Sequence, residues 1–310
     1  RNRLYWDDFK QMPSLWPPPK EQAAIADFLD HHARISQRLI RAKRRQIELL
    51  NEQKQAIIHQ AVTRGLDPDV PLKPSGIDWL GDVPAHWEIR KLKYVARFDN
   101  GFPFKPSDWK SDGTPIIRIQ NLNGSTEFNY SDRDDIPEHL IIQPGDLLFA
   151  WSGNRGTSFG SFIWAGPSSG FLNQHIFRVT SEGVDHTFFY YLLRAVTAHV
   201  EDQAHGIIGL VHITKPDLGA IAVPFPPRSE QEAIGAHLEF RVGEIMTTIG
   251  RIQREIDLIR EYRTRLIADI VTGKLDVRGV ELSVIDEADE AAWDEGDSSE
   301  DDIDQDEQAL

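Results

Sequence analysis

The chain has 310 residues, no cysteine and a formal net charge of −15. The lack of cysteine excludes disulfides and thiolate metal sites and favours a cytoplasmic protein. No apolar run approaches the ~18 residues that a membrane-spanning helix needs, so no membrane role is expected.

An internal repeat organises the chain. Residues 21–67 align without a gap with residues 230–276, at an offset of 209, and the shared residues include the Glu-Gln pair that opens each copy. At the same offset, residues 4–18 match residues 213–227. We therefore predict that residues 1–16 are the remnant of a first domain, of which this chain holds the second copy.

The first repeat, 17–66, is predicted to be a long helix. It follows three prolines, opens with Glu21 in the first turn and ends at Gly65, which are typical helix limits. It is locally basic. Apolar residues at coiled-coil spacing run along it, interrupted by Ser36, Lys43 and Lys54: Ile40, Ile47, Leu50 and Ile57.

Residues 67–226 are predicted to form an α+β domain. Its first part, 67–88, reads as a Pro-rich linker with three apolar residues that we expect to be buried, Trp79, Leu80 and Trp87. Short apolar runs punctuated by Gly, Asn, Ser and Pro predict strands at 115–119, 146–150, 162–164 and 175–179. One helix is expected at 186–204.

The second repeat, 227–280, is predicted to be the second long helix, with a clean coiled-coil seam. Residues spaced alternately by four and three form it, broken only by Arg263: Leu238, Val242, Ile245, Ile249, Ile252, Ile256, Ile259 and Leu266. So narrow a seam needs a partner. The simplest partner is the first helix, packed antiparallel, although a homodimer would also satisfy it.

The segment 281–310 holds fourteen acidic residues and no Lys or Arg, which leaves 35 acidic of 49 against 34 basic residues elsewhere. Such a block is typical of a disordered, solvated tail. Either it is a solubilising extension, or it mimics DNA and competes for a basic groove.

Motifs for catalysis are weak. The sequence has no Gly-rich phosphate loop and no Gly-x-Ser-x-Gly elbow, and its histidines lack zinc-ligand spacing. Asp108-Trp109-Lys110 looks like a fragment of a nuclease motif but has no partner acid, and we attribute it to chance. We predict no catalytic residue and no metal site.

Polar loops in 67–226 offer amides, hydroxyls and cations, the groups that contact base edges and phosphates. The same residue types also mark ordinary turns, which is the alternative interpretation. The predicted DNA-binding residues are Asn100, Lys105, Arg118, Asn121, Asn123, Ser152, Asn154, Arg155, Thr157, Ser158, Asn173, Gln174 and His175.

Several of these motifs together resemble one known family, the DNA-specificity subunit of type I restriction-modification systems. The resemblance covers nearly the whole chain except the acidic tail. It is carried by five stretches, namely residues 18–22, 57–66, 75–87, 143–149 and 226–231.

The resemblance implies a non-catalytic subunit. Residues 67–226 would be a target-recognition domain that reads one half of a bipartite double-stranded DNA sequence, flanked by two long helices that form an antiparallel coiled coil and set the gap between the halves. Type I methylation subunits would dock on the helices and bring S-adenosylmethionine, so no cofactor is expected in this chain. A motor-nuclease subunit would join through the methylase complex.

The chain departs from the family in carrying one recognition domain and a remnant. It is therefore either a fragment or a half-size form that pairs with a second specificity chain. The main alternative is a coiled-coil scaffold for protein interactions that does not bind DNA sequence-specifically.

Overall fold

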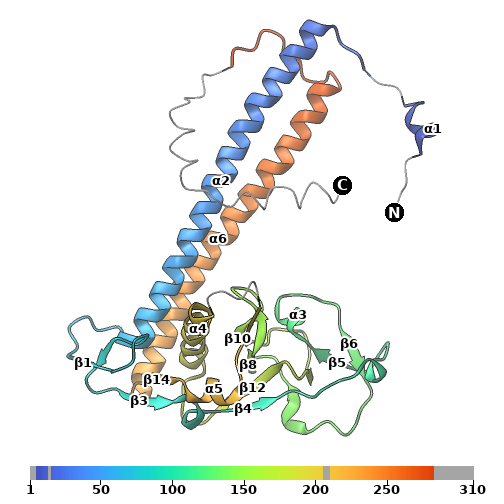
Figure 1. Ribbon diagram of the computed structural model, residues 1–310. Coiled ribbons are helices and arrows are strands. Elements are labelled where there is room, and N and C mark those ends of the chain that lie inside the picture. The colour runs from blue at the N-terminus through green and yellow to red at the C-terminus, as the bar shows by residue number, and fades with distance from the viewer. Residues whose placement is uncertain (1–4, 13–14, 205–209, 283–310) are drawn as a thin grey trace. The chain divides into compact units, whose positions relative to one another are not determined.

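The computed structural model describes residues 5–12, 15–204 and 210–282 (Figure 1). Nearly all of the predicted acidic tail lies outside these residues. The chain divides into two compact units. Unit 1 comprises residues 1–44 and 253–310, and unit 2 comprises residues 45–252.

Two long helices carry the repeated sequence, α2 at Pro19–Arg64 and α6 at Arg228–Val271. They begin at equivalent positions of the repeat, 209 residues apart. A glycine follows each helix in the left-handed conformation, Gly65 at φ 75° and Gly273 at φ 72°, which is a common way to end a helix. The short helix α1, Trp6–Phe9, likewise starts 209 residues before α5, Lys215–Ala220.

The predicted seam positions of α6 share one pattern of burial. Every seam position is turned away from solvent, whereas intervening apolar residues such as Phe240 and Leu258 are exposed. In unit 2 the buried or half-buried seam residues are Leu238, Val242, Ile245, Ile249 and Ile252. In unit 1 they are Ile256, Ile259, Leu266 and Ile270.

The predicted partner of this seam, α2, is confirmed. In unit 1, Lys43 of α2 forms an ion pair with Glu255 of α6. In unit 2, the Lys54 Nζ atom lies 3.7 Å from the sulfur of Met246. Further contacts give the direction: in unit 1, residues 29–36 of α2 line one cavity with residues 263–267 of α6, and in unit 2 Ile58 shares a core with Leu238. Residue numbers thus rise along α2 as they fall along α6 within each unit, and the helices are antiparallel. The predicted residues of α2 are all half-buried: Ile40, Ile47, Leu50 and Ile57.

Polar residues that interrupt the apolar pattern of α2 lie in the seam rather than outside it. Ser36 is buried, and its hydroxyl donates to the His32 carbonyl 2.8 Å away. Lys54 is half-buried and donates to the Asn51 side chain at 2.8 Å. Burial lowers the pKa of Lys54, and the nearby Arg194 lowers it further. Polar seam residues fix the register of a coiled coil at some cost in stability.

The globular part of unit 2 is built from short strands, as Figure 1 shows. The strands are β1 Leu72–Pro74, β2 Asp82–Pro84, β3 Glu88–Lys91, β4 Ala96–Asn100, β5 Thr114–Ile117, β6 Asn129–Ser131, β7 Ile141–Ile142, β8 Leu147–Ala150, β9 Ser152–Asn154, β10 Gly160–Ile163, β11 Gly170–Leu172, β12 Ile176–Ser181, β13 Leu210–His212 and β14 Ala222–Phe225. The helices are α3 Ile119–Leu122, α4 His186–Gln203 and α5, with 3-10 turns η1 Leu92–Tyr94, η2 Pro106–Asp108 and η3 Glu138–Leu140.

These strands form two larger sheets and three strand pairs. One sheet has the order β10-β8-β12-β4 and is antiparallel throughout. The other has the order β6-β5-β11-β7, in which only β11 and β5 run parallel. The pairs are β1-β2, β13-β9 and β14-β3. The four predicted strands and the predicted helix at 186–204 are thus present.

The largest hydrophobic core joins the globular domain to both long helices. It contains Phe188 and Leu192 of α4, and it also takes in Ile58 and Val62 near the end of α2 and Leu238 near the start of α6. Since these residues share one core within unit 2, the globular domain is fixed to the adjoining helix ends. Two smaller hydrophobic cores contain strand residues of the sheets, one including Ile142 and the other Phe171.

The predicted Pro-rich linker requires a correction. Residues 67–88 contain β1 and β2, which pair antiparallel, and Trp87 is almost wholly buried in the main core. Prolines at strand ends are compatible with such short pairs, because an edge position needs no N–H from proline. The burial predicted for Leu80 and Trp87 is confirmed, and Trp79 is partly buried.

The seam predicts a sharp contrast between two apolar residues of α6. Ile256 is 2% exposed and Leu258 is 62% exposed. Ile256→Lys should destabilise the chain by about 3–5 kcal/mol, because it removes a packed side chain and buries a charge. Leu258→Lys is the matched control and should change stability by about 0.5 kcal/mol or less. Chemical denaturation of both variants measures the change in the free energy of unfolding. Equal changes for the two variants would contradict the seam.

Lys54→Met should stabilise the chain by about 1 kcal/mol at neutral pH. The folded-state pKa of Lys54 lies below the ordinary 10.5, so the protonated form opposes folding until the pH passes the folded-state pKa. The gain should therefore shrink as the pH approaches 10.5, the usual value. Lys20→Met, at an exposed position of α2, is the control. A destabilised Lys54→Met variant would show that the lysine is well accommodated.

Candidate nucleic-acid interface

A turn before β12 brings several predicted DNA-binding residues together. This hub loop comprises Asn173, Gln174 and His175. The Asn173 amide donates to the Ile117 carbonyl at 3.1 Å, and the Ile176 amide donates back to the Asn173 carbonyl at 3.1 Å. The loop is thereby joined to the ends of β5, β11 and β12, which belong to both larger sheets.

Asn100 approaches the hub loop through the glycine that follows it. The Gly101 amide donates to the Ile176 carbonyl at 3.0 Å, and a Cβ atom at Gly101 would lie 2.1 Å from the Asn173 carbonyl oxygen. Only glycine allows the two backbones to come so close. The end of β4 and the hub loop are thus held at one place, where Asn100 is exposed and Asn173 is half-buried.

An aromatic residue clamps the other side of the hub loop. The Trp151 indole donates to the Gln174 carbonyl at 2.9 Å, and its ring lies 5.2 Å from the exposed His175 ring, centroid to centroid. Ser152 follows Trp151 and is half-buried. The Gln174 side-chain oxygen is buried without a hydrogen-bond partner among the described residues. The loop therefore carries an imidazole and two amides on a rigid backbone.

The second cluster is the turn at 154–158, which follows β9. The Asn154 carbonyl accepts from the Ser158 amide at 3.0 Å, and the Ser158 hydroxyl accepts from the Asn154 amide at 2.6 Å. Ser158 is buried and shapes the turn, whereas Asn154, Arg155 and Thr157 are exposed. The turn thus presents three polar side chains to solvent.

This turn is anchored to the end of α4. The Gly156 amide donates to Glu201 at 2.7 Å, and the Arg155 guanidinium donates to Asp202 at 3.0 Å. An exposed ion pair of this kind contributes about 0–1 kcal/mol. A phosphate or a guanine edge can therefore replace Asp202 as the partner of Arg155 at little cost.

The predicted residues around α3 divide into two kinds. Asn121 is 6% exposed and its side chain is fully used, accepting from the Arg118 amide and donating to the carbonyls of Ser125 and Glu127. It shapes the loop and has no donor left for a base. Arg118 donates to Asn129 at 2.8 Å and lies over the Trp109 ring, while Asn123 is exposed.

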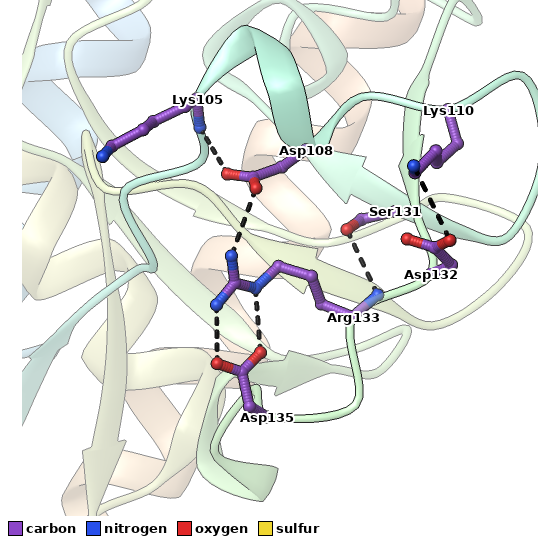
Figure 2. A network of polar contacts seen from close by, with 7 residues as sticks. All are labelled: Lys105, Asp108, Lys110, Ser131, Asp132, Arg133 and Asp135. Atoms are coloured by element: carbon purple, nitrogen blue, oxygen red, sulfur yellow. Dashed lines mark hydrogen bonds and ion pairs between the residues drawn. The ribbon is translucent and has the colours of Figure 1, made fainter.

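Lys105 lies beside an ion-pair network that the sequence did not reveal (Figure 2). Its backbone amide donates to Asp108 at 2.7 Å, and Asp108 also accepts from Arg133 at 3.1 Å. Arg133 further donates to both oxygens of Asp135, at 2.8 and 2.6 Å. The Arg133 guanidinium also lies over the Phe102 ring, with its carbon 4.8 Å from the ring centroid.

Electrostatics explains why this network is stable. The backbone amide of Lys105 and then Arg133 hold the pKa of Asp108 below its usual value, and Arg133 lowers the pKa of Asp135. Both carboxylates stay charged until the pH falls below the ordinary range of Asp, so the network persists at neutral pH. Asp108 is thereby committed to binding Arg133, and Lys110 pairs with Asp132 at 3.8 Å.

The structure thus gathers Asn100, Ser152 and the hub loop, and it places 154–158 directly after β9. It does not bring Lys105 or Asn123 into hydrogen-bond contact with the hub loop. The gathered groups can donate and accept hydrogen bonds at base edges. Among the described residues, no cluster of His, Asp and Glu could hold a metal ion, and no helix is long and apolar enough to cross a membrane.

Two long antiparallel helices joined to an α+β domain with such loops define a class of proteins, and comparison with known proteins identifies it. The family model "Type I restriction modification DNA specificity domain" matches residues 84–256. The chain belongs to this family. The resemblance seen in the sequence is confirmed.

Relatives of known type support the assignment. The chain is 28% identical over 204 residues to the type I restriction enzyme EcoBI specificity subunit of Escherichia coli, covering 64% of this chain and 41% of that protein. It is 28% identical over 288 residues to the MjaVIII specificity subunit of Methanocaldococcus jannaschii, covering 88% of this chain and 64% of that protein. The chain therefore spans less than two thirds of the length of either relative.

A solved structure shows the same fold. It comes from work on complex assembly and conformational transition of the type I R-M system. The TM-score is 0.61 at 16% identity, and the match covers 84% of this chain and 61% of the solved chain.

The close approach at Gly101 gives a testable contrast. Gly101→Ala should destabilise the domain by about 2–3 kcal/mol, because the new methyl group would overlap the backbone of Asn173. Gly243→Ala is the control, since nothing lies within 4 Å of its added Cβ and it sits within α6. That change should stabilise the chain by about 0.5–1 kcal/mol. Thermal unfolding of the two variants should shift in opposite directions; a neutral Gly101→Ala would refute the tight junction.

Proposed function

We propose that this chain is a sequence-specific DNA-recognition subunit of a type I restriction-modification complex. The domain at 67–226 reads one half of a bipartite double-stranded target. The observation that carries the proposal is the junction in unit 2, where polar loops are built on a domain whose core includes residues of α2 and α6. If the helices are to set the gap between two half-sites, the DNA-contacting surface must be fixed to the helix ends.

The hub loop and the turn at 154–158 are the proposed contact surfaces. The hub loop is held by backbone hydrogen bonds and by the Trp151 indole, so its side chains are positioned before DNA arrives. Pre-positioned groups lose little conformational entropy on binding, which favours affinity and discrimination. The exposed Asn154 and Arg155 have the chemistry to pair with adenine and guanine respectively.

The exposed faces of the helices are proposed to bind the type I methylation subunits. Large apolar residues lie in solvent on α6, where soluble helices normally carry polar groups: Phe240, Leu258 and Tyr262. S-adenosylmethionine is then bound by the methylation subunits, and a motor-nuclease subunit joins through them. This chain itself catalyses nothing. A second specificity chain, or a second domain, reads the other half of the target.

A non-DNA-binding scaffold is the competing function, and the exposed apolar residues of α6 are the observation in its favour. Selection from a random DNA pool, with and without methylation subunits, separates the two functions. One enriched short motif supports DNA recognition. Assembly with partners but no enriched motif would favour the scaffold. Incubation with S-adenosylmethionine and DNA should leave DNA unmethylated by this chain alone.

Asn154→Ala and Arg155→Ala should each weaken specific binding by about 1–3 kcal/mol if the residue reads a base, and should relax the selected motif at one position. If Arg155 instead contacts a phosphate, binding should weaken equally for all sequences and its salt dependence should decrease. Arg241→Ala, an exposed arginine of α6 paired with Glu244, is the control. Unchanged affinity and an unchanged motif would remove both residues from the interface.

A further inference from the structure

The side chains of the first residues of α6 form hydrogen bonds with the globular domain. Glu230 accepts from the Trp87 indole at 2.9 Å and contacts the His86 ring nitrogen at 2.6 Å. Gln231, 1% exposed, accepts from the Asp185 amide at 2.8 Å and donates to the Pro226 carbonyl at 2.9 Å. We call the Glu-Gln pair and these partners the clasp.

The clasp holds two separate parts of the domain. Trp87 precedes β3, and Asp185 caps α4, accepting from the Phe188 amide at 2.9 Å. The helix comes close at this point, because a Cβ atom on Gly235 would lie 2.9 Å from the Asp185 carboxylate and 3.0 Å from the Phe188 nitrogen. Two directional hydrogen-bonded anchors on different elements add an orientation to the position that the shared core already fixes.

The same pair opens the first repeat. Glu21 and Gln22 lie 209 residues before Glu230 and Gln231. The Gln22 amide donates to the Pro17 carbonyl at 2.8 Å, which is the equivalent of the Gln231 bond to Pro226. The internal bond of the clasp is thus preserved, yet Gln22 is exposed where Gln231 is buried.

Apolar residues that precede Gln22 in the sequence are also more exposed than their repeat equivalents. Phe9 is 54% exposed, whereas its repeat equivalent Leu218 is 0% exposed. Trp16 is exposed, whereas its equivalent Phe225 is half-buried in β14 with Arg90 over its ring. The first repeat therefore repeats the polar and apolar positions that form the junction at α6, but Gln22, Phe9 and Trp16 are exposed there.

We propose that Glu230 and Gln231 are positioning residues that set the angle of the recognition domain on α6. This inference rests on the proposed function, because the angle of each domain then determines the gap accepted between two half-sites.

The α6 clasp is tested in the full chain without DNA. In E230A/Q231A, hydrogen exchange at the Asp185 amide and the Trp87 indole should be roughly tenfold faster, since both lose their acceptor. E230Q keeps an acceptor for the indole and should preserve that protection. E244A, which removes the partner of Arg241 further along α6, is the control. Wild-type exchange rates in E230A/Q231A would overturn the clasp. If that double variant does not fold, the exchange rate of the Trp87 indole is measured in E230A alone.

The functional consequence is tested with the methylation subunits and a random DNA pool. The variant E230A/Q231A should select the same half-site sequence with a wider range of gap lengths, whereas a merely structural loss would lower yield without widening the range. An unchanged single gap would overturn the positioning role. If the wild-type chain selects no motif, the DNA-recognition proposal fails, and the exchange experiment still decides the clasp.

Discussion

A narrow stripe of apolar residues, the seam, holds the two long helices together. Neither helix can bury that seam alone, and a helix with so narrow an apolar stripe is stable only against a partner. In this chain the partner is the other copy of the same sequence, packed antiparallel, as the contacts of Lys43 with Glu255 and of Lys54 with Met246 show within their units. Antiparallel pairing follows from connectivity, because one domain must leave α2 at its end and return at the start of α6.

Polar groups make the pairing specific. Ser36, Lys43 and Lys54 occupy positions where an uninterrupted seam would place leucine or isoleucine. Each is accommodated differently, by a backbone carbonyl, by an ion pair and by an amide oxygen. Such positions reduce stability, but they disfavour other registers and the pairing of a helix with its own copy. The basic character of α2 is thus partly a property of the seam.

The sequence predicted the helices and their pairing well, since a spacing of four and three is a local, one-dimensional signal. It predicted strands only where apolar runs were long enough, as at β8 and β12. Strands such as β9 and β13 have three residues each, and they exist only through pairing of Ser152–Asn154 with Leu210–His212. No local pattern announces such a contact.

The predicted contact residues were harder for a related reason. A buried, hydrogen-bonded asparagine and an exposed one have the same side chain, so Asn121 and Asn154 look alike in sequence and differ only in what surrounds them. Arg133 was missed because its local partner, Asp135, gives no sign of the second one, Asp108, which lies 25 residues away. The close approach at Gly101 requires a glycine, but the sequence does not say which segment lies against it.

The absence of cysteine makes the central claim directly measurable. Cysteines placed at Lys43 and Glu255 can be joined with a short bifunctional maleimide, and the product separated by mass. The intrachain helix pair predicts rapid cross-linking within one chain, independent of protein concentration, with no reaction when Leu258 replaces Glu255 as the labelled site. Cross-links only between chains, or none, would contradict a helix pair that closes on itself.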